Sequence, residues 1–204
     1  MSAANDVGQP AGAGGPEVRG QRPSGRTSFD PRSLIGRTFG DRYRIDGLLG
    51  KGGMSVVYRA VEVGSGRPIA LKVMSSSVSE DERQILRFKQ EARASSRLNH
   101  PSIVRVSDYG QSSDGLLYMA MELLEGRTLG QLVKRDGPLP PKRACRILSD
   151  ACAALAEAHR LGIIHRDLKP DNIFLVTEEP NSGKDTVKLL DFGIAKMHSD
   201  GSQA

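Results

Sequence analysis

The chain has 204 residues, of which 26% are charged and 38% hydrophobic, a composition typical of a globular protein with one or two domains. Its net charge of +5 comes from scattered Lys and Arg, and only 4% of its residues are aromatic, so we interpret it as a mildly basic surface and expect no nucleic-acid partner. The sequence has neither an apolar run of membrane-spanning length nor a signal peptide, so we expect no membrane segment and a cytoplasmic location.

The first 37 residues differ in composition from the rest. They contain seven Gly and four Pro and show no periodic apolar pattern. A segment of this kind cannot bury enough apolar surface to offset the entropy lost on ordering. We therefore predict a disordered tail over residues 1–37.

Short apolar runs between residues 43 and 122 predict five strands and one helix. The strands are expected at 43–49, 55–63, 68–74, 103–109 and 116–122. The helix is expected at 79–98, because Ile85, Phe88, Ala92 and Ser95 fall on one face. These elements predict a small antiparallel sheet with a single helix.

The chain becomes helical in character from residue 126 onward. A long helix is predicted at 141–161, with Gly162 beyond its end. Ala144, Ile147, Leu148, Ala151, Leu155 and Ala158 form an apolar stripe along one side of it. Cys145 and Cys152 are two turns apart on this helix, beyond disulfide reach, and are interpreted as reduced structural thiols. A sheet followed by a helical region predicts an α+β fold with a ligand cleft between the two parts.

A glycine-rich stretch follows the first predicted strand. Residues 49–57 read LGKGGMSVV, in which Gly50 and Gly52 allow the backbone to approach a phosphate group closely. Ser55 occupies a position where a third Gly is common in phosphate-binding loops. An ordinary glycine-rich hairpin fits these residues equally well.

Lys72 lies in a strand that its apolar neighbours predict to be buried. A buried ammonium group is costly unless it is paired, and Glu91 on the predicted helix is the expected partner. Two unrelated surface charges remain the alternative for this pair taken alone.

Residues 165–172 read HRDLKPDN, and Asp191-Phe192-Gly193 follows nineteen positions after Asn172. Transfer of a phosphoryl group needs a carboxylate near the attacking hydroxyl, a cation near the phosphate and oxygen ligands for Mg²⁺. Asp167, Lys169 and Asn172 supply these groups from one loop, and Asp191 supplies a second oxygen ligand. The pattern therefore predicts phosphoryl transfer from ATP.

Together with the glycine-rich stretch, Lys72 and Glu91, these motifs resemble the bacterial eukaryotic-like (Hanks-type) serine/threonine protein kinases. The resemblance covers residues 43–196. It implies a bilobal fold with a five-stranded N-lobe at 38–124, including the hinge, and a C-lobe at 125–204. That C-lobe is expected to be partial and truncated within the activation segment, because the family's later helices have no counterpart here.

The resemblance also assigns roles to individual residues. Asp167 is the expected catalytic base, Lys169 steadies the γ-phosphate, and Glu91 braces Lys72, which holds the α- and β-phosphates. Asn172 and Asp191 are the expected Mg²⁺ ligands, while His165 and Phe192 are expected to pack between the lobes. The expected ATP-binding residues are Leu49, Gly50, Lys51, Gly52, Gly53, Met54, Ser55, Val57, Ala70, Lys72, Met121, Glu122, Leu124 and Phe174.

Residues 177–186 are polar and are expected to form an insertion at a hairpin tip. Within this resemblance, Lys169 favours Ser and Thr hydroxyls of proteins as acceptors.

Two alternatives stay open. The chain could be a catalytically impaired module that binds nucleotide or full-length kinases, or a phosphotransferase acting on small molecules.

Overall fold

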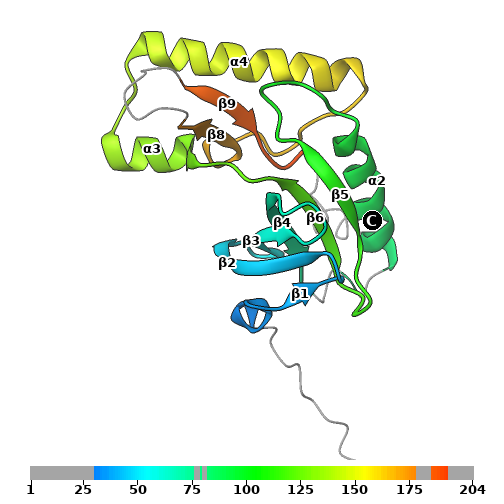
Figure 1. Cartoon of the computed structure of the whole chain (residues 1–204). Coiled ribbons are helices and arrows are strands. Elements are labelled where there is room, and N and C mark those ends of the chain that lie inside the picture. The colour runs from blue at the N-terminus through cyan, green and yellow to red at the C-terminus, as the bar shows by residue number, and fades with distance from the viewer. Residues whose placement is uncertain (1–29, 76–78, 80–81, 178–184, 193–204) are drawn as a thin grey trace, which may run out of the picture.

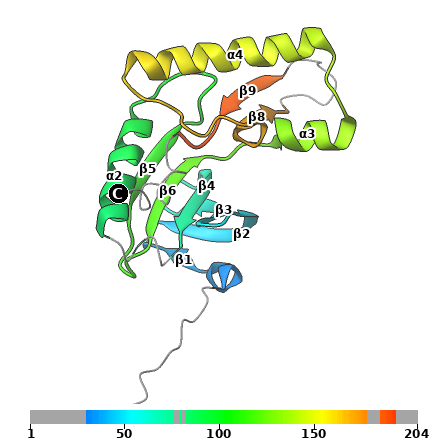
Figure 2. The same cartoon turned by 180° about the vertical axis from the view of Figure 1, so that it is seen from behind.

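The computed structural model describes residues 30–75, 79, 82–177 and 185–192, apart from the side chains of Arg87 and Glu91. Figures 1 and 2 show two regions in these residues. The first holds a large sheet with helix α2 at its side, and the second holds a small sheet with helices α3 and α4. The predicted α+β class is confirmed.

The first region is built on a six-stranded antiparallel sheet. Its strands are β1 (Thr38–Phe39), β2 (Tyr43–Lys51), β3 (Ser55–Glu62), β4 (Pro68–Met74), β5 (Val106–Gln111) and β6 (Leu117–Glu122), in the order β1-β2-β3-β4-β6-β5. The five predicted strands are present, and the sixth, β1, was not predicted. Two residues are too few to give a periodic signal, so β1 is recognisable only through its pairing with β2.

Helix α2 (Glu82–Ser96) covers one face of this sheet. Phe88 and Ala92 are fully buried against residues of β4, β5 and β6, as the helical spacing predicted. Ser95 on the same face is also buried. Strand β4 is buried on both faces after its first residue, which places Lys72 in the interior.

The tail prediction for residues 1–37 is wrong at its C-terminal end. A 3-10 helix, η1 (Pro31–Leu34), begins after Asp30, whose side chain accepts a hydrogen bond from the Arg32 N–H. Leu34 packs against the core of the sheet, and the Tyr58 hydroxyl donates to the Pro31 carbonyl at 2.9 Å. These contacts offset the ordering entropy on which the prediction rested. Residues 1–29 lie outside the described part.

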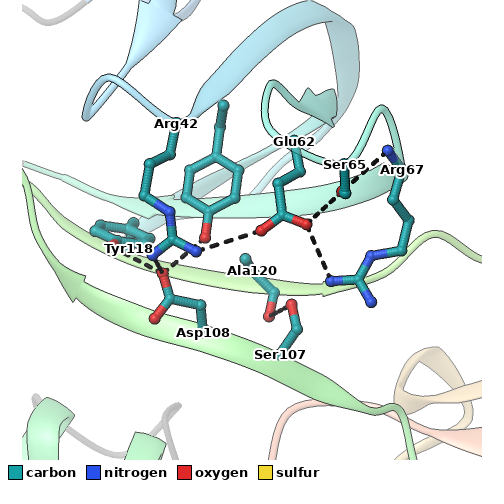
Figure 3. Close-up of polar contacts among 9 residues, drawn as sticks. Arg42, Glu62, Ser65, Arg67, Ser107, Asp108, Tyr118 and Ala120 are labelled. Carbon is teal, nitrogen blue, oxygen red and sulfur yellow. Dashed lines mark hydrogen bonds and ion pairs between the residues drawn. The ribbon is translucent and has the colours of Figure 1, made fainter.

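A polar network spans four strands of the large sheet (Figure 3). Asp108 Oδ2 on β5 accepts from Arg42 Nη1 at 2.8 Å, from the Tyr43 hydroxyl at 2.7 Å and from the Tyr118 hydroxyl at 3.0 Å. Arg42 also pairs with Glu62 on β3 at 3.3 Å. Burial, reinforced by the bond to Asp108, raises the pKa of both tyrosines. The network therefore fixes β2, β3, β5 and β6 relative to one another.

The second region contains a three-stranded sheet, of which the sequence indicated only the hairpin around residues 177–186. Its strands are β7 (Gly126–Thr128), β8 (Ile173–Val176) and β9 (Thr186–Leu189), in that order. Helix α3 (Leu129–Asp136), helix α4 (Pro141–Arg160) and the 3-10 helix η2 (Pro170–Asn172) complete it. Val176 pairs with Thr186, so the polar insertion does join two strands of a hairpin, although residues 178–184 lie outside the described part.

Helix α4 agrees with the prediction in its bounds, and its apolar stripe is only partly covered. Ile147, Ala151, Ala154 and Ala158 are buried, whereas Leu148 in the stripe is 53% exposed. Cys145 and Cys152 are both exposed free thiols, so their interpretation as structural residues is wrong. None of the described helices combines the length and apolar character needed to cross a bilayer.

Candidate functional site

A cavity of about 390 Å³ lies between the two regions, within the usual size range of small-molecule sites. Strands β2, β3, β4 and β6 contribute one wall, and residues around β7, β8 and β9 contribute the other. Its lining consists of Leu49, Gly50, Val57, Ala70, Lys72, Val104, Met121, Glu122, Leu123, Leu124, Gly126, Thr128, Gln131, Phe174, Leu190 and Asp191.

Most residues of the predicted ATP-binding set line this cavity. The exceptions are Lys51, Gly52, Gly53, Met54 and Ser55, which form the turn between β2 and β3. The Gly52 N–H donates to the Ser55 carbonyl at 2.8 Å and closes this turn. The structure brings the predicted residues together, and their roles in binding ATP stay predictions.

The sequence analysis missed six lining residues: Val104, Leu123, Gly126, Thr128, Gln131 and Leu190. A signal existed for one pair. Thr128 and Gln131 form a capping box at the start of α3, in which each side chain bonds the backbone N–H of the other residue. The remaining four lack a local pattern, because they reach the cavity only through the tertiary fold.

The HRDLKPDN loop gathers three of the predicted functional groups. Lys169 Nζ lies 2.8 Å from Asp167 Oδ2. The Asn172 side-chain amide donates to the Asp167 carbonyl at 2.8 Å and to Asp167 Oδ2 at 3.0 Å. These bonds, with the one from Lys169 the strongest, lower the pKa of Asp167, and the same contact raises the pKa of Lys169. Asp167 is thus held as a carboxylate.

Asp191 connects this loop to the first region. Its carboxylate pairs with Lys72 Nζ on β4, and the Lys72 side chain is only 8% exposed. Both residues line the cavity. The side chain of Glu91, the predicted partner of Lys72, lies outside the described part, so that pair stays a prediction.

Two residues next to the predicted catalytic groups have left-handed backbone conformations. Arg166 has φ of +61° and Asp191 has φ of +53°. Non-glycine residues adopt this region at an energetic cost, which the surrounding contacts must offset. Such positions concentrate at functional sites, so they support this location for the chemistry.

His165 and Phe192 are buried side chains, as expected for packing residues. Their ring centroids are 4.7 Å apart, at an interplanar angle of 51°. His165 Nε2 also lies 2.8 Å from the Leu190 carbonyl oxygen. The HRDLKPDN loop and the chain leading to Asp191 are therefore fastened to each other.

The donor set suits a hard cation bound together with a nucleotide. Among the described residues, no group of three or more His, Cys, Asp or Glu could hold a metal alone. Asp191 and Asn172 offer oxygen atoms, and Mg²⁺ is usually held by one or two protein oxygens, substrate phosphates and waters. The residues present therefore fit a divalent cation that arrives with a polyphosphate.

Comparison with known proteins identifies the family of this chain. The family model described as the protein kinase domain matches residues 43–204. The chain belongs to the protein kinase family. Within the family it is similar to serine/threonine-protein kinase pkn3 of Myxococcus xanthus, at 45% identity over 82% of this chain and 30% of that protein. Serine/threonine-protein kinase PknB of Mycobacterium leprae is 44% identical over 79% of this chain and 26% of that protein.

Solved kinase structures share the fold. The PknI kinase domain of Mycobacterium tuberculosis superposes with a TM-score of 0.68 and 35% identity, covering 78% of this chain and 62% of that one. Rad53 1-466 in complex with AMP-PNP gives a TM-score of 0.63 and 30% identity over 75% of this chain. The present chain thus spans under a third of the length of the two curated relatives named above. It spans about three fifths of the length of the PknI kinase-domain structure.

Proposed function

We propose that this chain carries the nucleotide site and catalytic loop of an ATP-dependent serine/threonine protein kinase, which transfers the γ-phosphate of ATP to Ser and Thr hydroxyls of proteins. One observation carries the proposal. The Asp167, Lys169 and Asn172 cluster is hydrogen-bonded to the stretch of chain that carries Asp191, which pairs with Lys72 in the cavity wall. The link is direct, because the Leu190 N–H beside Asp191 donates to the Asn172 carbonyl at 2.9 Å.

The cavity wall suggests how ATP is oriented. Leu49, Val57 and Ala70 on one side and Phe174 on the other offer apolar surfaces to the adenine ring. Backbone groups of Glu122 and Leu124 are proposed to bond its polar edge. Lys72, which β4 carries into the cavity wall, would then bind the α- and β-phosphates, because its ammonium group attracts their negative charge.

The reacting groups lie beyond the phosphates. Asp167 would accept the proton of the incoming hydroxyl, and its lowered pKa keeps it in the basic form needed for that step. Lys169 would neutralise charge on the transferring phosphoryl group. Asn172 and Asp191 would hold Mg²⁺, which supplies charge stabilisation to the phosphate oxygens when bound.

The preference for Ser and Thr and the cytoplasmic location belong to the same proposal. The relatives named above are called serine/threonine-protein kinases, which supports the choice of acceptor. Lys169 in the catalytic loop agrees with it. Protein substrates are therefore preferred over small alcohols.

One observation favours the alternative of a non-catalytic module that pairs with full-length kinases. An apolar groove of about 640 Å³ opens between α3 and α4, and exposed Val133 and Leu148 contribute to its lining. Exposed apolar surfaces rimmed by polar residues commonly mark protein contacts. A module of this kind would bind ATP without transferring phosphate.

Phosphate transfer from radiolabelled ATP to casein and histone distinguishes the two functions. The kinase predicts incorporation that requires Mg²⁺ and falls about 100-fold or more in Asp167→Asn, because a positioned general base contributes about that factor. The affinity for ATP should stay unchanged in that variant. Arg67→Met, which changes an exposed side chain in the turn between β3 and β4 outside the cavity lining, serves as the control and should leave transfer unaffected. Equal transfer by the parent and Asp167→Asn would contradict the kinase proposal.

A further inference from the structure

An ion pair that the sequence did not predict joins the two regions beside the nucleotide cavity. Lys188 Nζ on β9 lies 2.7 Å from Glu122 Oε1 at the end of β6. Strand β6 belongs to the six-stranded sheet and β9 to the three-stranded sheet. The side chains are 15% and 33% exposed, respectively, so this pair is less screened by solvent than a surface pair.

The pair is part of a larger junction. Residues 102–105 run between β9 and Glu122 and bond to both. On one side, the Leu189 N–H donates to the Ser102 carbonyl at 2.8 Å, and the Val104 N–H donates to the Leu189 carbonyl at 3.0 Å. On the other side, the Arg105 N–H donates to Glu122 Oε1 at 2.8 Å. Segment 102–105 and β9 therefore form one backbone unit.

Lys188 closes this junction from the β9 side. Besides Glu122, its ammonium donates to the Ile103 carbonyl at 3.4 Å. Glu122 Oε1 consequently receives both the Lys188 ammonium and the Arg105 N–H. One carboxylate oxygen thus binds both β9, which precedes Asp191, and segment 102–105, which leads into β5.

The junction lies between two residues that line the nucleotide cavity, Glu122 itself and Asp191, which follows β9. Glu122 lines the cavity where the adenine edge is expected, and Asp191 lines it where the phosphates and the metal are expected. Lys188 is three residues before Asp191 on the same stretch of chain. Fixing β9 to Glu122 therefore fixes the spacing between the adenine end and the phosphate end.

We propose that the Glu122–Lys188 pair couples these two ends, which makes Lys188 a positioning residue for ATP. This inference rests on the proposed function. A ligand that reaches both ends gains affinity when the protein holds them at the correct spacing beforehand, because less motion is lost on binding. A ligand that touches only the adenine end gains nothing from the pair.

Titration calorimetry with adenosine and with Mg·ADP tests the coupling. Adenosine occupies the adenine end, and Mg·ADP spans the cavity. In Lys188→Met we expect Mg·ADP binding to weaken about fivefold or more, the lower end of typical coupling between sites. Adenosine binding should stay within about twofold of the parent. Lys188→Arg, which keeps the cation, should restore Mg·ADP binding.

Arg143→Met provides the matched control. Arg143 pairs with Asp185 at 2.7 Å, with side chains 34% and 18% exposed, so this pair resembles Glu122–Lys188 in burial. It connects α4 to the chain before β9 and touches no residue of the cavity lining. Its loss should lower the melting temperature without changing the ratio of adenosine affinity to Mg·ADP affinity.

Each outcome decides the proposal. A selective loss of Mg·ADP affinity in Lys188→Met, rescued by arginine, supports coupling. Equal weakening of both ligands, or weakening of neither, overturns it and leaves Lys188 as a stability contact. If Lys188→Met fails to fold, Glu122→Gln, which keeps acceptors for both donors but removes the charge, must show the same selectivity. A parent that binds neither ligand would overturn the proposed function itself.

Discussion

Both regions of the molecule expose some apolar side chains, and the second region also leaves an apolar groove open between α3 and α4. In the first, α2 covers one face of the six-stranded sheet, and tyrosines, β1 and Leu34 fill the other. In the second, α3 and α4 pack on the small sheet, yet exposed apolar side chains remain nearby. Leu148, Ile164 and Leu168 are 53%, 61% and 49% exposed.

The difference bears directly on the chemistry. The first region supplies most of the apolar cavity wall and Lys72, whereas the second region supplies Asp167, Lys169, Asn172 and Asp191. Residues that would orient adenine are thus held mainly by the large sheet, and those that would transfer phosphate are held by the region with the open groove. We expect binding to be more robust than transfer.

Matched truncations in the two regions should give the largest contrast in stability. Phe88→Ala removes a fully buried ring from the first region and should cost about 3–5 kcal/mol of unfolding free energy. Leu148→Ser removes an exposed side chain from the second region and should change it by less than about 0.5 kcal/mol. Urea denaturation measures both values. A cost above about 2 kcal/mol for Leu148→Ser would mean that its face is covered in solution.

The polar contacts of the two regions should differ in the same direction. Asp108→Ala removes the acceptor shared by Arg42, Tyr43 and Tyr118 and should cost about 2–3 kcal/mol, because partly buried donors lose a charged acceptor. Asp108→Asn should recover part of this loss. Arg143→Met in the second region should cost about 1 kcal/mol or less. If urea denaturation shows equal losses of unfolding free energy for Asp108→Ala and Arg143→Met, the polar contacts of the two regions do not differ in strength.

The sequence predicted those parts of the fold that repeat a local pattern. The strands that became β2 to β6 alternate or run apolar, and α2 carries its buried residues at helical spacing. Strands β7 and β8 are only three and four residues long and follow no period. Their pairing depends on contacts between residues about fifty positions apart, such as Thr128 with Phe174.

Helix α3 shows how a tertiary contact determines a residue near the site. Gly130 lies in its first turn, where glycine lowers helix propensity. The structure explains the glycine, since a Cβ there would lie 2.6 Å from Asp171 Oδ1. The close approach of α3 to the HRDLKPDN loop therefore determines this residue. The Glu122–Lys188 pair was invisible for a related reason, because 66 positions separate its members.

The pKa of Asp167 reports whether the HRDLKPDN loop of the second region keeps its contacts in solution. Contact with Lys169 holds the pKa of Asp167 below its ordinary value, so the carboxylate stays ionised as the pH falls through that ordinary value. The stabilisation is present above the ordinary pKa and is lost only as the pH falls through the lower, folded value. Lys169→Met should move the pKa of Asp167 upward.

Carboxyl carbon shifts measured by NMR follow the titration of Asp167 directly. An Asp167 that titrates at the ordinary value in the parent would mean that the Lys169 contact does not persist in solution.

The central claim is that both regions together form a folded site for ATP and a divalent cation. A thermal melt of the 204-residue chain with and without Mg·ATP tests it most directly. Ligand at one hundred times its Kd should stabilise the chain by about 2.7 kcal/mol, or roughly 5–10 °C. We predict a shift of this size that requires Mg²⁺ and shrinks in Lys72→Met. A cooperative transition that Mg·ATP leaves unmoved would contradict the account.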